Sequence, residues 1–216
     1  MLDYDKKCRI VDTKMDEIGP WKWVIEDNGL WNIIAYEWQH LKSLWGKHVK
    51  SYNVCVQAGG ACGMYPRLLS ETFKHVYTFE PNPISFHCLV NNCQSNNISK
   101  FNMGLGSEPG VAMIKTQGLN NLGEARIRTD GDYRIVLTTI DSLFLDACDF
   151  IQLDIENYEL NALHGAAETI RKFKPVISVE NGSEEILNFL KSLAPYEHVG
   201  SFGIGSDRSD DVYKVI

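Results

Sequence analysis

From residue 53 onward, short apolar runs alternate with stretches in which apolar residues recur every three or four positions. Continuous apolar runs are typical of strands buried on both faces of a sheet, and the wider spacing is typical of amphipathic helices. The expected strands are residues 53–57, 75–79, 100–103, 149–154, 176–180, 197–202 and 212–216. The expected helices between them are residues 64–73, 82–93, 160–170 and 183–193. This order predicts an α/β protein with a doubly wound, mostly parallel sheet.

The last two expected strands form a hairpin, so the terminal strand should run antiparallel to the rest. The prediction is therefore a Rossmann-like, doubly wound seven-stranded sheet with an antiparallel terminal strand. Residues 105–136 interrupt the alternation before the fourth strand of this sheet. Within them, residues 111–114 and 125–128 are expected to pair around the polar turn 118–121. Loops at such an edge often contact substrate, so we expect this insertion to shape an acceptor pocket.

Residues 1–50 contain all five tryptophans of the chain. Apolar residues there recur at near-helical intervals, namely Trp31, Ile34, Tyr36, Trp38, Leu41 and Trp45. The spacing predicts an amphipathic helix. We therefore expect a tryptophan-rich helical extension, residues 1–50, that packs onto a main domain of residues 51–216.

Composition narrows the classes of partner. The 216 residues carry a formal net charge of −7, which argues against a broad surface for nucleic acid or anionic lipid. No apolar stretch has the ~20 residues that a membrane span requires, and charged residues interrupt the N-terminus. The six cysteines include no C-x-x-C pair, which favours a reduced, cytoplasmic protein. We expect no nucleic-acid or membrane partner, and oligomeric state is not predicted.

The strongest local signal is a glycine-rich turn after the first expected strand, followed by Glu80 at the end of the second. Glu80 lies 21 positions after Gly59. This spacing is typical of a fold that binds an adenosine-containing cofactor, in which the carboxylate accepts hydrogen bonds from the ribose hydroxyls. The G-x-G-x-x-G pattern of dinucleotide-binding proteins would require a glycine at Ala58. The register Gly59-x-x-x-Gly63 instead suits S-adenosylmethionine, although a nicotinamide oxidoreductase remains an alternative.

Four ordered segments resemble the FkbM-type methyltransferases. They are Val56-Gln57-Ala58-Gly59-Gly60-Ala61-Cys62-Gly63, Phe79-Glu80-Pro81-Asn82-Pro83, Thr138-Thr139-Ile140-Asp141-Ser142-Leu143 and Asp149-Phe150-Ile151-Gln152-Leu153-Asp154-Ile155-Glu156. The match continues through Leu163-His164-Gly165-Ala166 and Pro175-Val176-Ile177-Ser178-Val179-Glu180, covering roughly residues 50–216. The resemblance implies a class I S-adenosylmethionine-dependent methyltransferase. It also implies O-methylation of a hydroxyl on a sugar, glycan or other small-molecule acceptor.

By position, the resemblance also assigns the cofactor site. Gln57 ends the first strand, and the methionine part of the cofactor would be lined by Gly59, Gly60, Ala61 and Gly63. Glu80 would hold the ribose, with Pro81 and Asn82 beside it, and Asn102, Met103 and Gly104 would approach the adenine.

The chain departs from the family at four positions. Gln57 replaces an acidic residue, Ala61 an asparagine, Gln152 a lysine and Asn157 a glycine. An amide at Gln57 brings no charge to the ammonium group of the cofactor, which could weaken binding by ~1 kcal/mol. These changes leave a second hypothesis open, a cofactor-binding homologue with lost or altered catalysis.

The candidate catalytic residues follow the fourth strand of the sheet. Methyl transfer to an alcohol needs alignment of the acceptor and a base that takes its proton. We expect Asp154 to be that base or to orient the acceptor, with Glu156 as the second choice. No metal is expected, because the resemblance does not require one. An alternative would place Mg²⁺ on oxygen atoms of Asp154, Glu180 and Asn181, although the last two residues could equally cap the following helix.

Overall fold

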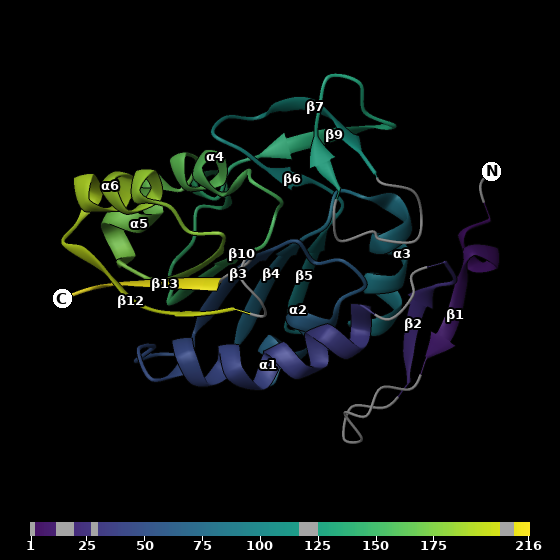
Figure 1. Cartoon of the computed structure of the whole chain (residues 1–216), viewed down its shortest axis with the longest axis horizontal. Coiled ribbons are helices and arrows are strands. Elements are labelled where there is room, and N and C mark those ends of the chain that lie inside the picture. Colours follow the sequence, from purple (N-terminus) through teal and green to yellow (C-terminus); the bar gives the residue numbers. More distant parts are fainter. Residues whose placement is uncertain (1–2, 12–19, 27–29, 117–124, 204–209) are drawn as a thin grey trace.

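A central mixed sheet with helices on both faces forms the body of the computed structural model (Figure 1). The structure describes residues 3–11, 20–26, 30–116, 125–203 and 210–216, with only the backbone described at 30–37. Its central strands are β3 (Val54–Ala58), β4 (His75–Phe79), β5 (Ile98–Phe101), β10 (Phe150–Leu153), β11 (Val176–Glu180), β12 (Tyr196–Phe202) and β13 (Asp210–Val215). Their order across the sheet is β12-β13-β11-β10-β3-β4-β5.

The strand directions confirm the predicted fold class. Strands β3, β4, β5, β10 and β11 pair in parallel, whereas β13 is antiparallel to both of its neighbours. The terminal strand is thus antiparallel, although it lies inside the sheet and β12 forms the edge. The chain continues from β3 to β4 and β5 on one side and returns to β10 and β11 on the other, so the topological switch point of the sheet lies between β3 and β10.

Two helical layers cover the sheet (Figure 1). One face packs against α1 (Leu30–Gly46), α2 (Met64–Ser70) and part of α3 (Pro83–Asn92). The other packs against α4 (Glu159–His164), α5 (Ala167–Phe173) and α6 (Glu184–Leu193). The alternation of side chains gives the central strands other than β5 one side in each of these two hydrophobic cores, whereas Ile98 of β5 packs in a smaller cluster with Leu89 and Cys93.

The single helix expected over residues 160–170 is divided into α4 and α5. The division falls at Gly165, where a Cβ atom would lie 2.0 Å from the carbonyl oxygen of Gly106. The carbonyl of Gly165 accepts a hydrogen bond from the backbone of Asp141 instead of continuing the helix. The carboxylate of Asp141 then accepts hydrogen bonds from the backbone of Glu168 and Thr169 in α5. Packing against a distant loop therefore interrupts a continuous helical pattern.

The insertion forms a second, smaller sheet in the order β6-β9-β7-β8. Its strands are β6 (Gly104–Leu105), β7 (Gly110–Lys115), β8 (Arg126–Ile127) and β9 (Tyr133–Thr138). The expected pairing of its first and second segments is present as β7 and β8, and the turn at 118–121 lies outside the described residues. The sequence analysis missed β9, which is the main partner of β7. Its signal was the alternation of Tyr133, Ile135 and Leu137 with polar or exposed residues.

The N-terminal segment contains a short 3₁₀ helix, η1 (Tyr4–Lys7), and a hairpin of β1 (Cys8–Val11) and β2 (Trp21–Val24) that were not predicted. Trp21 and Trp23 in β2 are fully buried. In α1, Trp38, Leu41 and Trp45 are buried in the same core, and the ring of Trp45 stacks on Phe150 at 4.7 Å. The expected contacts of Trp31, Ile34 and Tyr36 lie outside the described side chains. Within the described ranges, no helix has the length and apolar character needed to cross a membrane.

Candidate functional site

The carboxyl ends of four adjacent strands bring together the residues expected to carry chemistry. The register pairs Ala58 of β3 with Phe79 of β4 and with Leu153 of β10. Leu153 in turn pairs with Val179 of β11. The residues that follow in each chain segment are Gly59, Glu80, Asp154 and Glu180. They therefore form one row along the edge at which ligands bind in open α/β sheets.

The glycine-rich turn packs tightly against its neighbours. The backbone N–H groups of Gly59 and Gly60 both donate to the carbonyl of Phe79, at 3.1 and 3.0 Å. Gly59 has a φ of 81°, and a Cβ atom there would lie 1.8 Å from the carbonyl oxygen of Asp154. Gly63 has a φ of 95° and lies against α3. Neighbouring protein atoms thus require glycine at these positions, and the turn is held directly beside Asp154.

Glu80 is a buried carboxyl group that receives two backbone hydrogen bonds. Its Oε2 accepts from the N–H of Ala61, and its Oε1 from that of Asn82, both at 2.7 Å. Burial raises the pKa of Glu80 to about 7, against the opposing effect of these two hydrogen bonds. Ala61 adopts the left-handed region, with a φ of 43°, and so directs its N–H to this carboxylate. Glu80 therefore connects the glycine-rich turn to the start of α3.

Other residues assigned to the cofactor site gather around Glu80. The amide of Asn102 donates to the carbonyls of Glu80 and Pro81, at 2.8 and 3.1 Å. Asn82 caps α3 by accepting a hydrogen bond from Ile84 at 2.9 Å. Met103 is only partly buried against the core, and Gly104 begins β6 in the small sheet. Asn102 and Asn82 are thus fixed beside Glu80 by the backbone.

Gln57 belongs to a buried polar row across four parallel strands. Its partners in the strand register are Thr78 and Gln152, and Gln152 is paired with Ser178. The hydroxyl of Thr78 donates to Gln57 Oε1 at 2.5 Å, and Gln57 Nε2 donates to the carbonyl of Ala58 at 3.1 Å. Gln152 is 5 % exposed, and neither of its amide atoms has a hydrogen-bond partner within the part of the chain that the structure describes.

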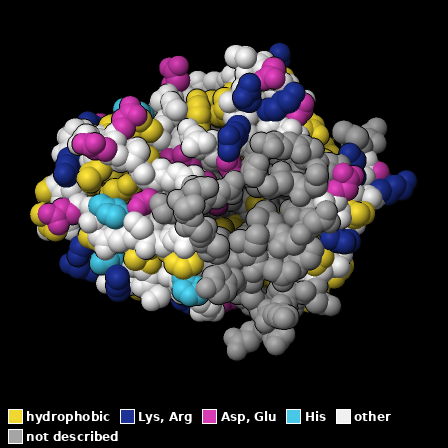
Figure 2. Space-filling model, in the orientation of Figure 1, with side chains coloured by type: hydrophobic (Ala, Val, Ile, Leu, Met, Phe, Trp, Pro, Cys, Tyr) yellow, Lys and Arg dark blue, Asp and Glu magenta, His cyan; other side chains and the backbone are white. Residues whose placement is uncertain are grey.

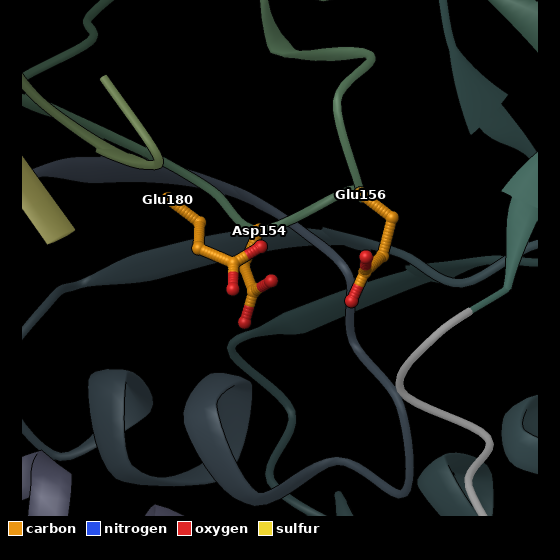
Figure 3. A group of neighbouring side chains, drawn as sticks. All are labelled: Asp154, Glu156 and Glu180. Carbon is orange, nitrogen blue, oxygen red and sulfur yellow. The ribbon is translucent and has the colours of Figure 1, made fainter. Parts of the chain in front are cut away.

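Three carboxyl groups converge beyond this polar row (Figure 3). One ligand oxygen from each of Asp154, Glu156 and Glu180 lies within 4.8 Å of the others. The carboxyl groups of Asp154 and Glu180 lie next to each other and share a hydrogen bond, and Glu156 approaches from the other side. Burial, followed by the charges of Glu180 and Asp210, raises the pKa of Asp154 well above its ordinary value. Asp154 therefore keeps its proton under conditions in which an exposed aspartate is ionised.

Glu156 has a different environment because it has a cationic partner. Arg126 of β8 contacts its Oε2 through Nη2 at 3.1 Å and Nε at 3.3 Å. Glu156 and Asn157 have φ values of 57° and 71°, and asparagine is one of the residues that tolerate this left-handed region best. Asn157 is therefore compatible with a backbone position that the resembling family fills with glycine.

The sequence analysis missed Arg126 and Asp210 as site residues. Arg126 lies in the alternating segment Ala125-Arg126-Ile127-Arg128. That pattern predicted a strand, but it did not predict the contact between Arg126 and Glu156. Asp210 pairs with Glu180 across β13 and β11, and its only sequence signal was its position at the start of the last strand. Of the proposed Mg²⁺ ligands, Asp154 and Glu180 are close together, and the third carboxylate of the group is Glu156.

On the face shown in Figure 2, basic and acidic side chains gather over the small sheet. The ion pairs of this sheet include Lys115 with Asp132, Arg128 with Asp130, and Arg126 with Glu156. One cation of the insertion, Arg126, thus reaches into the acidic group.

Comparisons with known proteins agree with this geometry. Residues 64–194 match the model of the methyltransferase FkbM domain. Among solved structures, an FkbM methyltransferase from Methylobacillus flagellatus KT has a TM-score of 0.58 and 23 % identity, over 76 % of this chain and 43 % of that one. An rRNA methylase from Streptococcus thermophilus has a TM-score of 0.50 and 8 % identity, over 82 % of this chain and 95 % of that one. The human methyltransferase 10 domain containing protein has a TM-score of 0.50 and 11 % identity, over 84 % and 81 %. No curated protein matches the sequence.

Proposed function

Because the chain belongs to the FkbM methyltransferase family, we propose that it transfers a methyl group from S-adenosylmethionine to a hydroxyl oxygen of a sugar or other small-molecule acceptor. The chain spans 43 % of the length of the FkbM methyltransferase to which it is similar, so the acceptor is argued from this chain's own site. Family membership favours this reaction over the nicotinamide-dependent oxidation that the glycine pattern left open.

The cofactor site proposed here is the turn beside Glu80. A carboxylate at the tip of the second core strand suits the two ribose hydroxyls, and each oxygen of Glu80 keeps a lone pair beyond its backbone bond. The turn itself lies against Asp154, so a sulfonium held by the turn would direct its methyl group toward the acidic group. S-adenosylmethionine supplies the electrophilic methyl group, and the protein aligns the acceptor oxygen with it.

The observation that carries the proposal is the Asp154–Glu180 pair at the ends of β10 and β11. When Asp154 is ionised, its carboxylate can accept a hydrogen bond from a hydroxyl acceptor. The raised pKa of Asp154 makes its ionised form a stronger base than an exposed carboxylate. The pair would therefore orient the acceptor and receive its proton as the oxygen–methyl bond forms.

The acidic character of the chain supports a small acceptor rather than a nucleic acid. A net charge of −7 repels phosphodiesters. The similarity to an rRNA methylase, at 8 % identity, concerns the fold. We therefore propose a sugar or another small hydroxyl compound as the acceptor, and neither a nucleic acid nor a membrane as a partner.

A second candidate, a cofactor-binding homologue without turnover, is favoured by the polar row. The amide of Gln57 is used by Thr78 and by the backbone of Ala58. Gln152, where the resembling family has lysine, brings no positive charge to the two carboxyl groups beyond it. Asp154 and Glu180 are hydrogen-bonded to each other without that charge, which is why we place catalysis first.

Calorimetric titration of the purified protein with S-adenosylmethionine, S-adenosylhomocysteine and NAD tests the cofactor. We expect the two sulfur ligands to bind and NAD to give no heat of binding. Transfer of a labelled methyl group to a panel of sugars, polyols and phenols then tests the reaction. Binding without transfer to any acceptor class would favour the second candidate, and binding of NAD alone would refute the proposal.

The same transfer assay decides between a base and a metal ion. Three carboxyl groups offer the oxygen ligands that Mg²⁺ prefers, but the pKa of Asp154 is raised well above its ordinary value, which opposes the ionised form that a metal ion needs. We propose the metal-free reaction and expect EDTA to leave the initial rate unchanged. A rate that falls with EDTA and returns with added Mg²⁺ would assign Asp154, Glu156 and Glu180 to a cation instead.

A further inference from the structure

Three cysteine thiols meet where the N-terminal hairpin, the glycine-rich turn and α3 come together. Cys8 lies on β1, Cys62 in the turn and Cys88 on α3. The Sγ atoms of Cys8 and Cys88 are 3.2 Å apart, although 80 positions separate them in the chain. Cys88 is also hydrogen-bonded to Cys62. All six cysteines of the chain are free thiols in the structure.

We propose that Cys8 and Cys88 form a site of reversible oxidation, at which a disulfide bond attaches the β1–β2 hairpin to helix α3. This site lies outside the carboxylate group, and the proposal does not depend on the methyltransferase activity.

The surrounding contacts already hold the two elements in position. The backbone N–H of Lys22 in β2 donates to Oδ1 of Asn92 in α3 at 2.7 Å, and Nδ2 of Asn92 donates back to the carbonyl of Lys22 at 2.8 Å. A disulfide requires an S–S distance of ~2.05 Å, so the two sulfur atoms must approach by only about 1 Å. A small rotation of the half-buried Cys8 side chain achieves this without separating the hairpin from the helix.

The electrostatic environment makes one of the two sulfurs the better nucleophile. Hydrogen bonds from Cys62 and from Cys8, together with the charge of Lys22, lower the pKa of Cys88 despite its burial. Burial raises the pKa of Cys8 to about 12. A thiolate is the reactive form of cysteine, so Cys88 is the member of the pair that loses its proton more readily.

The other three cysteines differ in this respect. Cys55, Cys93 and Cys148 are buried, and burial raises the pKa of each thiol. Cys88 is equally buried, so what distinguishes it is its contact with the sulfur atoms of Cys8 and Cys62. Only the pair at the hairpin therefore combines, among these described thiols, a sulfur neighbour at 3.2 Å with a partly accessible member.

Hydrogen peroxide is a sufficient oxidant for the reaction. The thiolate of Cys88 attacks one peroxide oxygen, the O–O bond breaks, and hydroxide leaves as a sulfenic acid forms. Cys8 then attacks the sulfenic sulfur, its proton neutralises the departing hydroxide, and the S–S bond forms. In total, two thiols and one peroxide give one disulfide and two waters, and the two electrons lost by sulfur reduce the peroxide.

The disulfide would also bear on the glycine-rich turn. Asn92, which holds Lys22, donates a further hydrogen bond from Nδ2 to the carbonyl of Cys62 at 2.6 Å. A disulfide between the hairpin and α3 would thus restrict the motion of Asn92, which connects Lys22 of β2 to Cys62 of the glycine-rich turn. Closing a loop of this length stabilises the folded state mainly by restricting the unfolded chain.

Treatment of the full chain with hydrogen peroxide, followed by alkylation, proteolysis and mass spectrometry, tests the proposal. We expect a peptide pair joined through Cys8 and Cys88 that dithiothreitol separates. We also expect the Tm of the oxidised protein to rise by about 5–15 °C relative to the reduced protein. The variant Cys8→Ser should show neither the joined peptides nor the rise in Tm.

The matched control is Cys62→Ala, which removes the other neighbour of Cys88 and should retain the Cys8–Cys88 linkage. A linkage between Cys62 and Cys88 in the wild type, or irreversible sulfinic acid without any linkage, would overturn the proposal. If Cys8→Ser does not fold, the thiol alkylation rates of the reduced wild type decide. Cys88 should then react faster than Cys148, and equal rates would count against the assignment.

Discussion

Arg126 and Glu156 are 30 positions apart in the chain, yet the guanidinium of Arg126 donates two hydrogen bonds to one carboxylate oxygen of Glu156. The side chain of Glu156 is 7 % exposed and that of Arg126 is 43 % exposed. This ion pair connects the small sheet of the insertion to the loop that follows β10. It also pairs one of the three converging carboxyl groups with a cation, whereas the other two, Asp154 and Glu180, are hydrogen-bonded to each other.

Removing Arg126 should therefore leave a buried carboxylate without its cation. We expect Arg126→Met to lower the free energy of unfolding by about 1–2 kcal/mol, which urea titration measures. Glu156→Gln should cost less, and the double variant should cost less than the sum of the two single changes. Additive effects would show that the contact contributes no coupling energy.

The Asp154–Glu180 pair predicts a loss of transfer without a loss of cofactor binding. We expect Asp154→Asn to reduce kcat by about 10²-fold or more while the Kd for S-adenosylmethionine stays within about threefold. Because the pKa of Asp154 is raised, the wild-type rate should increase with pH above the range in which exposed carboxylates titrate. This increase should be absent from Asp154→Asn. An equal loss of binding and turnover would make Asp154 a cofactor or folding residue.

Glu80 predicts that cofactor affinity increases with pH. Burial raises the pKa of its carboxyl group to about 7, and in the proposed cofactor site the ionised form would accept hydrogen bonds from the ribose hydroxyls. Below that pH, the affinity for S-adenosylmethionine should fall by about tenfold per pH unit, as measured by calorimetry. Glu80→Gln should remove this dependence, and Glu80→Ala should weaken binding by about 2 kcal/mol. Affinity that is independent of pH in the wild type would place the ribose elsewhere.

A rise in pH should have the opposite effect on the stability of the fold, through the same carboxyl group of Glu80. The folded pKa of Glu80 lies above its ordinary value of 4.5, so folding favours the protonated form. This contribution is complete below the ordinary value and is lost as the pH rises through about 7. The Tm of the cofactor-free wild type should therefore decrease across this interval more steeply than that of Glu80→Gln. If Tm fell equally with pH in the two proteins, the raised pKa of Glu80 would be contradicted.

Gly59 predicts a strong intolerance of any side chain. A Cβ atom would lie 1.8 Å from the backbone oxygen of Asp154, and the φ of 81° disfavours other residues. Gly59→Ala should lower the free energy of unfolding by about 3 kcal/mol or more. Gly110→Ala is the matched control, because nothing lies within 4 Å of its added Cβ, and it should change stability by less than about 0.5 kcal/mol. Similar losses at both positions would contradict the close approach at Gly59.

The fold was predictable from sequence because its strands and helices are local patterns repeated in order. Each parallel core strand can be recognised from its own short apolar stretch, as in His75–Phe79 and Val176–Glu180, without knowledge of its neighbours. Strand β9 was missed because it follows residues that resemble a loop, although Tyr133, Ile135 and Leu137 alternate. The hairpin of β1 and β2 was missed because the tryptophans of β2 were assigned to a helix-rich extension.

The candidate site was predictable only where strand ends determine it. Glu80, Asp154 and Glu180 each follow directly after, or end, a core strand, so their meeting follows from parallel order. Arg126 reaches Glu156 from a separate sheet, and no local pattern specifies such a contact. The role of Gln57 also needed the structure, since its amide is used by Thr78 within the sheet and not at its edge.

The buried row of Thr78, Gln57, Gln152 and Ser178 has a consequence for how the sheet assembles. Neighbouring positions on these strands, such as Val56 and Ile151, face the opposite core. A strand that joined the sheet one residue out of place would move an amide or hydroxyl into that apolar layer and lose the contact between Thr78 and Gln57. Misaligned pairings are thus penalised strand by strand during folding. The four polar side chains thereby favour the one alignment that brings Gly59, Glu80, Asp154 and Glu180 together at the ends of these strands.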